Sequence, residues 1–375
     1  MIMRFSEIIG NEALKAALVR MVQGNRLGHA ILFTEESGGG AFAFALALAQ
    51  YVNCKDFAGE GPRAIAGVGP RAIAGEGSRG TGSAEDSCGV CSSCHKYQKL
   101  IHPDLHFVFP VSSSTALSDS EKKAPISDYF LSAFRELALA NPYFTEQQLY
   151  DAIGIENKSG LISVHEARRI FEKLSLRAAE GTWKTMIIFL PEKMNLDAAN
   201  KLLKLLEEPP QGTLFLLVSH NPERLLPTIR SRCQPIRLLP LSREERRRVE
   251  GERTDDAEYR EIARSLLQAG LEKRIAELFP QWEMLADLGR EKQREWCLYM
   301  ENYIRKIYLV AGGLEDLADL SPQDEATVRD FAAKIKPAFY EKAFAALEDT
   351  LTAIGSNVNP KLTFCDLADR LLLAL

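Results

Sequence analysis

The chain has 375 residues, of which 46% are hydrophobic and 26% are charged. This composition excludes a chain that is disordered throughout, and the length allows two or three domains with cores of their own. The formal net charge of -5 excludes a strong general affinity for nucleic acid, so any contact with DNA has to be local or shared with partners.

The N-terminal stretch and the apolar runs indicate the compartment. Residues 1–15 lack a charged start followed by an apolar core, and the longest apolar run, residues 41–49, is too short to span a bilayer. We therefore expect a cytoplasmic protein with no membrane partner. In that compartment the 7 cysteines are expected to be thiols or metal ligands rather than disulfides.

The first predicted buried strand, residues 29–33, leads into a glycine-rich turn and a helix. These are the ingredients of a P-loop, whose amides and helix N-terminus bind phosphate. When the pattern GxxxxGK[ST] is laid on this segment, Gly40 retains the second glycine, but Glu35 replaces the first. Ala41 replaces the lysine, and Phe42 replaces the magnesium-binding hydroxyl. Because these side chains supply neither the positive charge nor the metal ligand, we expect no productive ATP binding here.

Cysteines at metal-ligand spacing follow. Cys88, Cys91 and Cys94 are each separated by two residues, and Cys54 stands at the end of the preceding helix. Four thiolates suit a tetrahedral structural Zn²⁺ site, so we expect a zinc module over about residues 54–94. His95 could replace Cys54 as the fourth ligand, and reduced thiols without a metal are the alternative reading.

An insert lengthens this module. Residues 61–68 and 69–76 form a near-perfect repeat, GPRAIAGV and then GPRAIAGE. We expect a disordered low-complexity loop over about residues 58–84. Lengthening a loop in this way costs only about 1 kcal/mol of closure entropy, so the insert should weaken metal binding little.

The stretch from residue 200 to 238 organises the N-terminal part of the chain. It predicts a helix ending near Glu207, a break at Pro209 and Pro210, a strand over 213–219, and a short basic helix ending in Ser-Arg-Cys. The run LFLLV does not alternate, which is typical of a strand buried on both faces. This pattern predicts an α/β fold with a parallel sheet.

Beyond Leu241 the predicted strands disappear. Helices near 256–268 and 271–287 suggest a small helical domain, and Trp296, Tyr299 and Tyr303 mark a long amphipathic helix that begins after Gly289. Two or three more helices follow to the C-terminus. Periodicity alone is equally compatible with a self-contained helical bundle.

The combination of LLKLLEEPP, the strand, the NPE turn and TIRSRC resembles the AAA+ subunits of clamp loaders, which place sliding clamps on DNA for replicative polymerases. The resemblance covers nearly the whole chain. It implies an AAA+ core with a parallel sheet and a zinc module over residues 1–240. A helical lid domain over 241–289 and an all-α collar for oligomerisation over 290–375 would follow.

The same resemblance implies a role for Arg232. In that family the arginine of Ser-Arg-Cys reaches ATP bound by a neighbouring subunit, and the permanently charged, planar guanidinium suits contact with phosphate oxygens. Arg232 is therefore expected to be a trans arginine finger. The alternative is a surface arginine that, like Arg224 and Arg230, pairs with Glu223 or faces solvent.

A second departure from the family concerns the strand over residues 183–190. The family ends this strand with Asp-Glu, where this chain has Phe189 and Leu190, and neither side chain can hold Mg²⁺ or activate water. With its degenerate P-loop, the chain is similar to the non-hydrolysing delta prime type of bacterial DNA polymerase III. That similarity implies a hetero-pentameric ring with gamma or tau and delta subunits, and contact with the sliding clamp and primer-template DNA through the complex.

Two other functions remain open at this point. An active ATPase of the gamma or tau type would need unusual nucleotide contacts. A zinc-dependent nucleic-acid adaptor would have to bind DNA alone, against the acidic balance of the chain.

Overall fold

The computed structural model describes residues 4–35, 37–55, 85–114, 117–155, 159–181, 183–250, 254–274, 279–318, 320–321, 323–356 and 358–375. The insert expected over about residues 58–84 lies outside the described residues. The cysteines on either side of it, Cys54 and Cys88, are described. The chain divides into two compact units, Met1–Val249 and Glu250–Leu375.

A parallel sheet forms the centre of the first unit. Its strands are β1 (Ala30–Thr34), β2 (Leu105–Val108), β3 (Lys184–Phe189), β4 (Thr213–Ser219) and β5 (Gln234–Arg237). They are arranged in the order β2-β3-β4-β1-β5, and each neighbouring pair is parallel. The predicted parallel α/β sheet is thus confirmed. Because parallel strands need crossovers, helices cover both faces.

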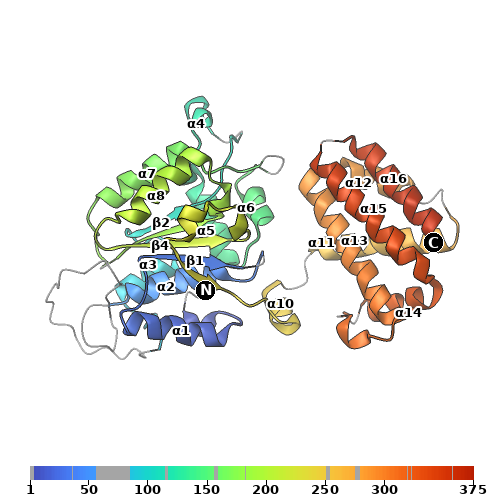
Figure 1. Cartoon of the computed structure of the whole chain (residues 1–375), viewed down its shortest axis with the longest axis horizontal. Coiled ribbons are helices and arrows are strands. Elements are labelled where there is room, and N and C mark those ends of the chain that lie inside the picture. Colours follow the sequence, from blue (N-terminus) through green and yellow to red (C-terminus); the bar gives the residue numbers. More distant parts are fainter. Residues whose placement is uncertain are drawn as a thin grey trace. The chain divides into compact units, whose positions relative to one another are not determined.

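Helices lie on both sides of this sheet, with α1 and α2 on one side and α7 and α8 on the other (Figure 1). The α-helices are α1 (Glu12–Gln23), α2 (Ala41–Val52), α3 (Ser92–Gln98), α4 (Asp119–Lys123), α5 (Leu131–Ala140), α6 (Glu146–Ala152), α7 (Val164–Ser175), α8 (Leu196–Glu207), α9 (Pro227–Arg230) and α10 (Arg243–Glu250). Short 3-10 helices are η1 (Phe5–Glu7), η2 (Ser127–Phe130), η3 (Pro191–Lys193) and η4 (Pro222–Arg224).

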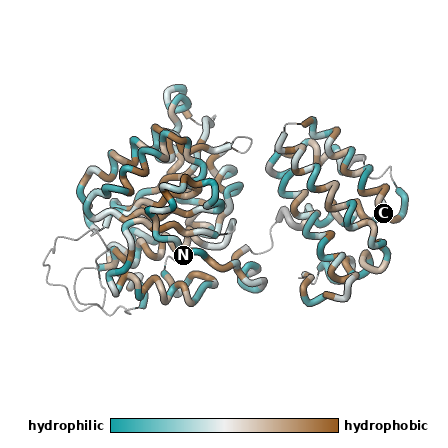
Figure 2. Tube along the Cα trace, viewed as in Figure 1, coloured by the Kyte–Doolittle hydropathy of each residue, from teal (hydrophilic) through white to brown (hydrophobic). Residues whose placement is uncertain are grey.

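Alternate residues of each strand enter different cores. Ile31 and Phe33 of β1 pack with α1 and α2, whereas Ala30 and Leu32 pack with α7 and α8. Figure 2 shows the corresponding concentration of hydrophobic residues in the strands between the helix layers. Because both faces are covered, a strand without polar alternation is stable, which explains the run LFLLV in β4.

Helix α8 shows how the local sequence sets an element. Its N-cap Asn195 accepts a hydrogen bond from the Ala198 N–H at 2.9 Å, and the helix ends at Glu207, before Pro209 and Pro210. Asparagine satisfies one of the free amides of the first turn, and the prolines prevent continuation. The predicted end of this helix and the predicted extent of β4 are both confirmed.

The described part of the second unit is helical. Its α-helices are α11 (Thr254–Leu271), α12 (Phe279–Asp287), α13 (Arg290–Ala311), α14 (Glu325–Lys334), α15 (Pro337–Gly355) and α16 (Pro360–Ala374), with the 3-10 helix η6 (Glu315–Leu317). All six α-helices contribute to one hydrophobic core. The expected boundaries between lid and collar stay predictions. Among the described helices of the whole chain, none combines the length and the apolarity that a membrane span requires.

Candidate functional site

The turn after β1 carries a carboxylate where a P-loop binds phosphate. Glu35 is buried, and its Oε2 accepts a hydrogen bond from the N–H of Ala41, the first residue of α2, at 2.7 Å. Gly40, just before it, has a φ of 95°, a conformation that glycine adopts without strain. The amide at this helix N-terminus therefore already has an anionic partner from the chain itself.

A histidine at the end of β4 faces the same carboxylate. The Nε2 of His220 lies 3.3 Å from Glu35 Oε1, with side-chain exposures of 13% and 3%. Glu192 in η3 holds the backbone there, because its Oε1 accepts from the N–H groups of His220 and Asn221 at 2.9 and 3.0 Å. Glu192 thus binds backbone amides that follow β4. His220 and Glu35 join the ends of β4 and β1.

Tyr143 covers the glycine turn from the other side. A Cβ added at Gly40 would come within 2.5 Å of the Tyr143 ring. The Tyr143 hydroxyl accepts a hydrogen bond from the Ile9 N–H at 2.7 Å, and burial raises the pKa of this phenol. The space above the turn is therefore filled by an aromatic ring that is held at its far end.

The positions expected to bind Mg²⁺ in an active relative lie in an aromatic cluster. Phe42 and Phe189 contact each other with ring centroids 6.0 Å apart, and Phe144 lies 5.0 Å from Phe42 and 4.9 Å from Phe189. Leu190 is fully buried. The fold thus brings the two degenerate motifs together, as expected, and supplies hydrocarbon where a metal would need oxygen ligands.

Arg232 follows α9 and lies beside the end of α8. Its Nη2 is 2.6 Å from Glu207 Oε1, and its Nη1 donates to the Thr228 carbonyl at 3.0 Å. The Arg232 side chain is 36% exposed. Arg230, and not Arg232, makes the pair with Glu223, at 2.7 Å. Arg232 therefore presents an accessible guanidinium that two separate elements orient.

Cys233, the last residue of the Ser-Arg-Cys motif, anchors this segment. It is buried against the core that α8 and α9 share, and burial raises the pKa of its thiol to about 12. A thiol in this state is a packing residue, as the sequence indicated, because the reactive and metal-binding form is the thiolate.

The structure brings four cysteines together at the end of α2 and the start of α3. The sulfur atoms of Cys54, Cys88, Cys91 and Cys94 all lie within 4.8 Å of one another, and those of Cys88 and Cys94 are 3.9 Å apart. Sulfur atoms around a tetrahedral Zn²⁺ are about 3.8 Å apart, as follows from Zn–S bonds of about 2.3 Å. The cluster can therefore hold a metal ion, and Cys54 rather than the exposed His95 is its fourth member among the described residues.

Backbone amides already point at these sulfur atoms. The N–H groups of Cys88, Cys91 and Cys94 donate to the sulfur atoms of Cys54, Cys88 and Cys91 at 3.3, 3.3 and 3.5 Å. A hydrogen bond with Cys91 raises the pKa of Cys54 to about 11, and the same bond lowers the pKa of Cys91. Crowded thiols thus resist losing all their protons together, and a bound dication would supply the compensating charge.

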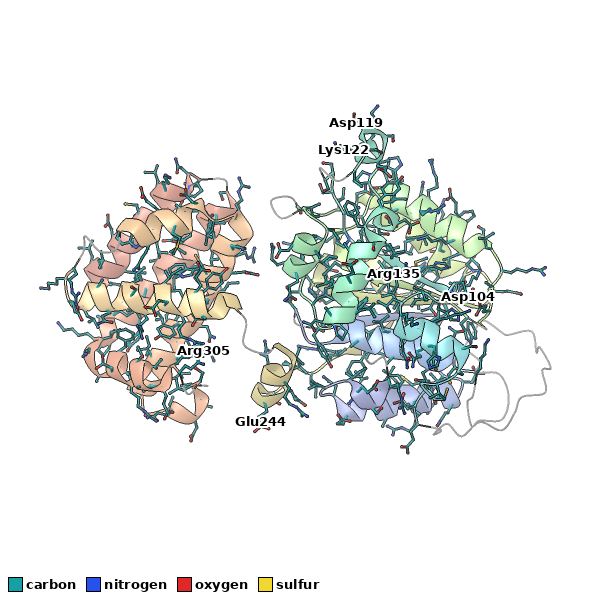
Figure 3. The ribbon with its side chains drawn as sticks, turned by 180° about the vertical axis from the view of Figure 1, so that it is seen from behind. Asp104, Asp119, Lys122, Arg135, Glu244 and Arg305 are labelled. Atoms are coloured by element: carbon teal, nitrogen blue, oxygen red, sulfur yellow. The ribbon has the colours of Figure 1, made fainter. Side chains whose placement is uncertain are left out.

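The cysteine cluster is joined to the core next to it. Asn53, adjacent to Cys54, donates to the Tyr97 hydroxyl at 2.7 Å and accepts from the Trp183 N–H at 3.0 Å. Asp104, labelled in Figure 3, accepts three backbone N–H bonds from residues 179–181. The Asn53 contacts connect the module to the residue that precedes β3, and Asp104 joins the start of β2 to the loop before β3, so the cluster is part of the first unit.

Three residues of these sites were not expected from sequence. Tyr143, Glu207 and His220 come from elements far from their partners along the chain, so spacing gives no hint of their contacts. His220 had one available signal, because it directly follows the buried run of β4. Polar residues at the carboxyl ends of parallel strands often line the functional edge of a sheet.

Comparisons with known proteins identify relatives of this chain by sequence. The family described as "DNA polymerase III, delta subunit" matches residues 74–242. The DNA polymerase III subunit delta' of Bacillus subtilis (strain 168) is 28% identical over 224 residues, which cover 60% of this chain and 46% of the relative. The DNA polymerase III subunit gamma/tau of Mycobacterium bovis is 25% identical over 238 residues, 63% of this chain and 29% of that one.

A solved structure is also similar. It is a DNA polymerase III, gamma subunit-related protein from Thermotoga maritima, which covers 72% of this chain and 94% of its own, with a TM-score of 0.31 and 18% identity. The match to the Bacillus relative spans about half of that relative's length. The expected resemblance to bacterial DNA polymerase III delta prime subunits is confirmed by the family match and the curated relatives.

Proposed function

We propose that this chain, which is related in sequence to the DNA polymerase III delta prime subunits, is the non-hydrolysing delta prime subunit of a clamp loader. In this role it would supply Arg232 to ATP bound by a neighbouring gamma or tau subunit. It would thereby help to load the sliding clamp on primed DNA. The observation that carries the proposal is the contrast between an accessible, oriented Arg232 and a phosphate cradle that the chain fills with its own Glu35.

The chemistry of Arg232 suits this role. Phosphoryl transfer spreads negative charge over the transferred group, and a positioned guanidinium stabilises that charge. The guanidinium of Arg232 is held by one carboxylate and one carbonyl, which leaves other N–H donors for a phosphate oxygen. Its contribution would be electrostatic, with no bond made or broken at Arg232 itself.

The degenerate site supports the non-hydrolysing half of the proposal. A triphosphate would have to displace the Glu35 carboxylate from the Ala41 amide and the Tyr143 ring from Gly40. It would gain no lysine in return, because Ala41 stands at that position. Phe42 and Phe189 offer no oxygen to Mg²⁺.

For the cysteine cluster we propose a structural Zn²⁺ bound by Cys54, Cys88, Cys91 and Cys94. Its support is the sulfur geometry and the amides that donate to three of the sulfur atoms. With all four positions taken by protein sulfur, the ion would have no open site for catalysis. It would tie the end of α2 to the start of α3.

The proposed partners are the gamma or tau and delta subunits of a hetero-pentameric ring, and the clamp and primer-template DNA through that ring. The collar expected over residues 290–375, which lies within the second unit, is the proposed site of oligomerisation. With a net charge of -5, this chain would contribute little general attraction to DNA, so the complex as a whole would provide it.

The test is reconstitution with the partner subunits. We expect Arg232→Ala to leave assembly intact and to lower clamp- and DNA-stimulated ATP hydrolysis. At the one site it serves, the loss should be roughly a thousandfold or more, the usual contribution of an arginine finger. Arg230→Ala is the matched control, because Arg230 is similarly exposed and also pairs with a glutamate. Equal hydrolysis by wild type and Arg232→Ala would refute the proposed role.

A further inference from the structure

Glu207 occupies an unfavourable place for a carboxylate. It is the last residue of α8, where the helix dipole presents its negative end, and Glu208 follows it directly. A negative charge at this end is destabilising unless a cation compensates it. The compensating cation is Arg232, whose Nη2 lies 2.6 Å from Glu207 Oε1.

The pair also sets the direction of the guanidinium. The Thr228 carbonyl binds Nη1 from within the Arg232 segment, whereas Glu207 binds Nη2 from another helix. The pair remains accessible, with 36% of the Arg232 side chain and 43% of the Glu207 side chain exposed. An incoming anion can therefore reach Arg232 and compete with Glu207.

We propose that Glu207 is a positioning residue that holds Arg232 in the separate chain and yields it to an ATP phosphate when the neighbouring subunit docks. This inference rests on the proposed function of Arg232. Binding of the phosphate replaces one anion of the guanidinium by another, so no proton or bond is transferred. Because Glu207 competes with the phosphate, removal of its charge should make Arg232 easier to engage.

The expected size of the effect follows from the solvent exposure of the ion pair between Arg232 and Glu207. Exposed ion pairs contribute little to stability, and their loss corresponds to a change of about two- to fivefold in an equilibrium constant. In the reconstituted ring, Glu207→Gln should therefore lower the ATP concentration that gives half-maximal hydrolysis by about two- to fivefold. The maximal rate should stay unchanged, and the shift should shrink at high salt because exposed charges are screened.

Two controls isolate the mechanism. Glu208→Gln removes the neighbouring charge, for which the described residues show no ion pair, and should leave the half-maximal ATP concentration unchanged. In the Arg232→Ala background, Glu207→Gln should have no effect, because the group it competes for is absent. An equal shift in that background, or none in the wild-type background, would overturn the inference.

A measurement on the separate chain distinguishes this inference from the proposed function. Phenylglyoxal modifies accessible arginines, and mass spectrometry can follow Arg232 and Arg230 in one sample. Glu207→Gln should raise the modification rate of Arg232 about two- to fivefold and leave Arg230 unchanged, whereas Glu208→Gln should change neither. An unchanged Arg232 rate would refute the pairing, whereas unchanged ATP hydrolysis by Arg232→Ala would refute the arginine-finger role.

Discussion

Glu35 illustrates how one residue changes the use of a familiar motif. A carboxylate that binds the first amide of α2 satisfies a donor that a bound phosphate would otherwise satisfy. The turn can therefore be stable without a nucleotide. The Nε2 of His220 lies 3.3 Å from the same carboxylate.

We expect Glu35→Ala to lower the free energy of unfolding of the first unit by about 1–3 kcal/mol, because a buried N–H is left without its partner. Glu35→Gln should cost less, since its amide oxygen can still accept from Ala41. Chemical denaturation of the three proteins measures the difference. The alanine variant should still not hydrolyse ATP, because it gains no lysine. Magnesium-dependent turnover by this variant alone would contradict that expectation.

We expect His106 in β2 to make stability depend on pH. Burial, with a smaller effect of Lys173, lowers its pKa from 6.5 to about 4. As the pH falls from 6.5 towards 4, the unfolded chain takes up a proton that the folded chain does not, so stability falls. Above 6.5 neither state is protonated at this residue, and the contribution is constant.

The variant His106→Asn should therefore lose less stability than wild type between pH 6.5 and 4. Denaturant titrations at several pH values, with zinc held constant, provide the measurement. His165→Asn, at an exposed position of α7, is the control. A wild-type stability that falls no more steeply than that of His106→Asn would show that burial does not lower this pKa.

Single residues could be predicted where sequence spacing or an ordered motif identifies them. The spacing of Cys88, Cys91 and Cys94 predicted a cluster that the structure forms. Arg232 was singled out only because it ends a long ordered run, and its arginine-finger role stays a prediction. Glu207 could not be foreseen as its partner, since that contact depends on how α8 and α9 pack.

At the scale of elements, helices and strands with a distinctive local sequence could be predicted, whereas their arrangement in the fold could not. The apolar run of β4 and the double proline after α8 identify those elements locally. The position of β1 between β4 and β5 depends on pairing between segments far apart in sequence. No local pattern orders β1, β3 and β4, because these buried strands present similar apolar side chains on both faces.

The cysteine module gives a prediction at the same scale. If the cluster binds zinc, a chelator should lower the unfolding free energy of the first unit by about 4 kcal/mol, the value for free zinc at about a thousand times its Kd. Cys88→Ser should have a similar effect. Cys365→Ser, which changes an exposed thiol of α16, should have none. Metal analysis measures the zinc content of each variant, and thermal unfolding measures its stability.

An absence of stoichiometric zinc in the purified full-length protein would contradict this prediction. So would equal stability of Cys88→Ser and Cys365→Ser in the presence of zinc. Low pH should release the ion, because the ligands bind it as thiolates and protonation competes with the metal.

At the scale of the whole molecule, the two compact units have different proposed roles. The first unit contains the P-loop-like turn that Glu35 fills, Arg232 and the cysteine cluster, and the second contains the proposed oligomerisation collar over residues 290–375. The acidic net charge of the chain agrees with a role inside a complex, where other subunits would provide most of the attraction to DNA.

The most direct test of the central claim is a structure of the assembled ring with a non-hydrolysable ATP analogue and Mg²⁺. We predict that the Arg232 guanidinium lies about 3 Å from a phosphate oxygen of the nucleotide bound by the neighbour, and that Glu35 still binds the Ala41 amide. A nucleotide bound beside Ala41 and Phe189, or an Arg232 turned away from every neighbouring phosphate, would contradict the account.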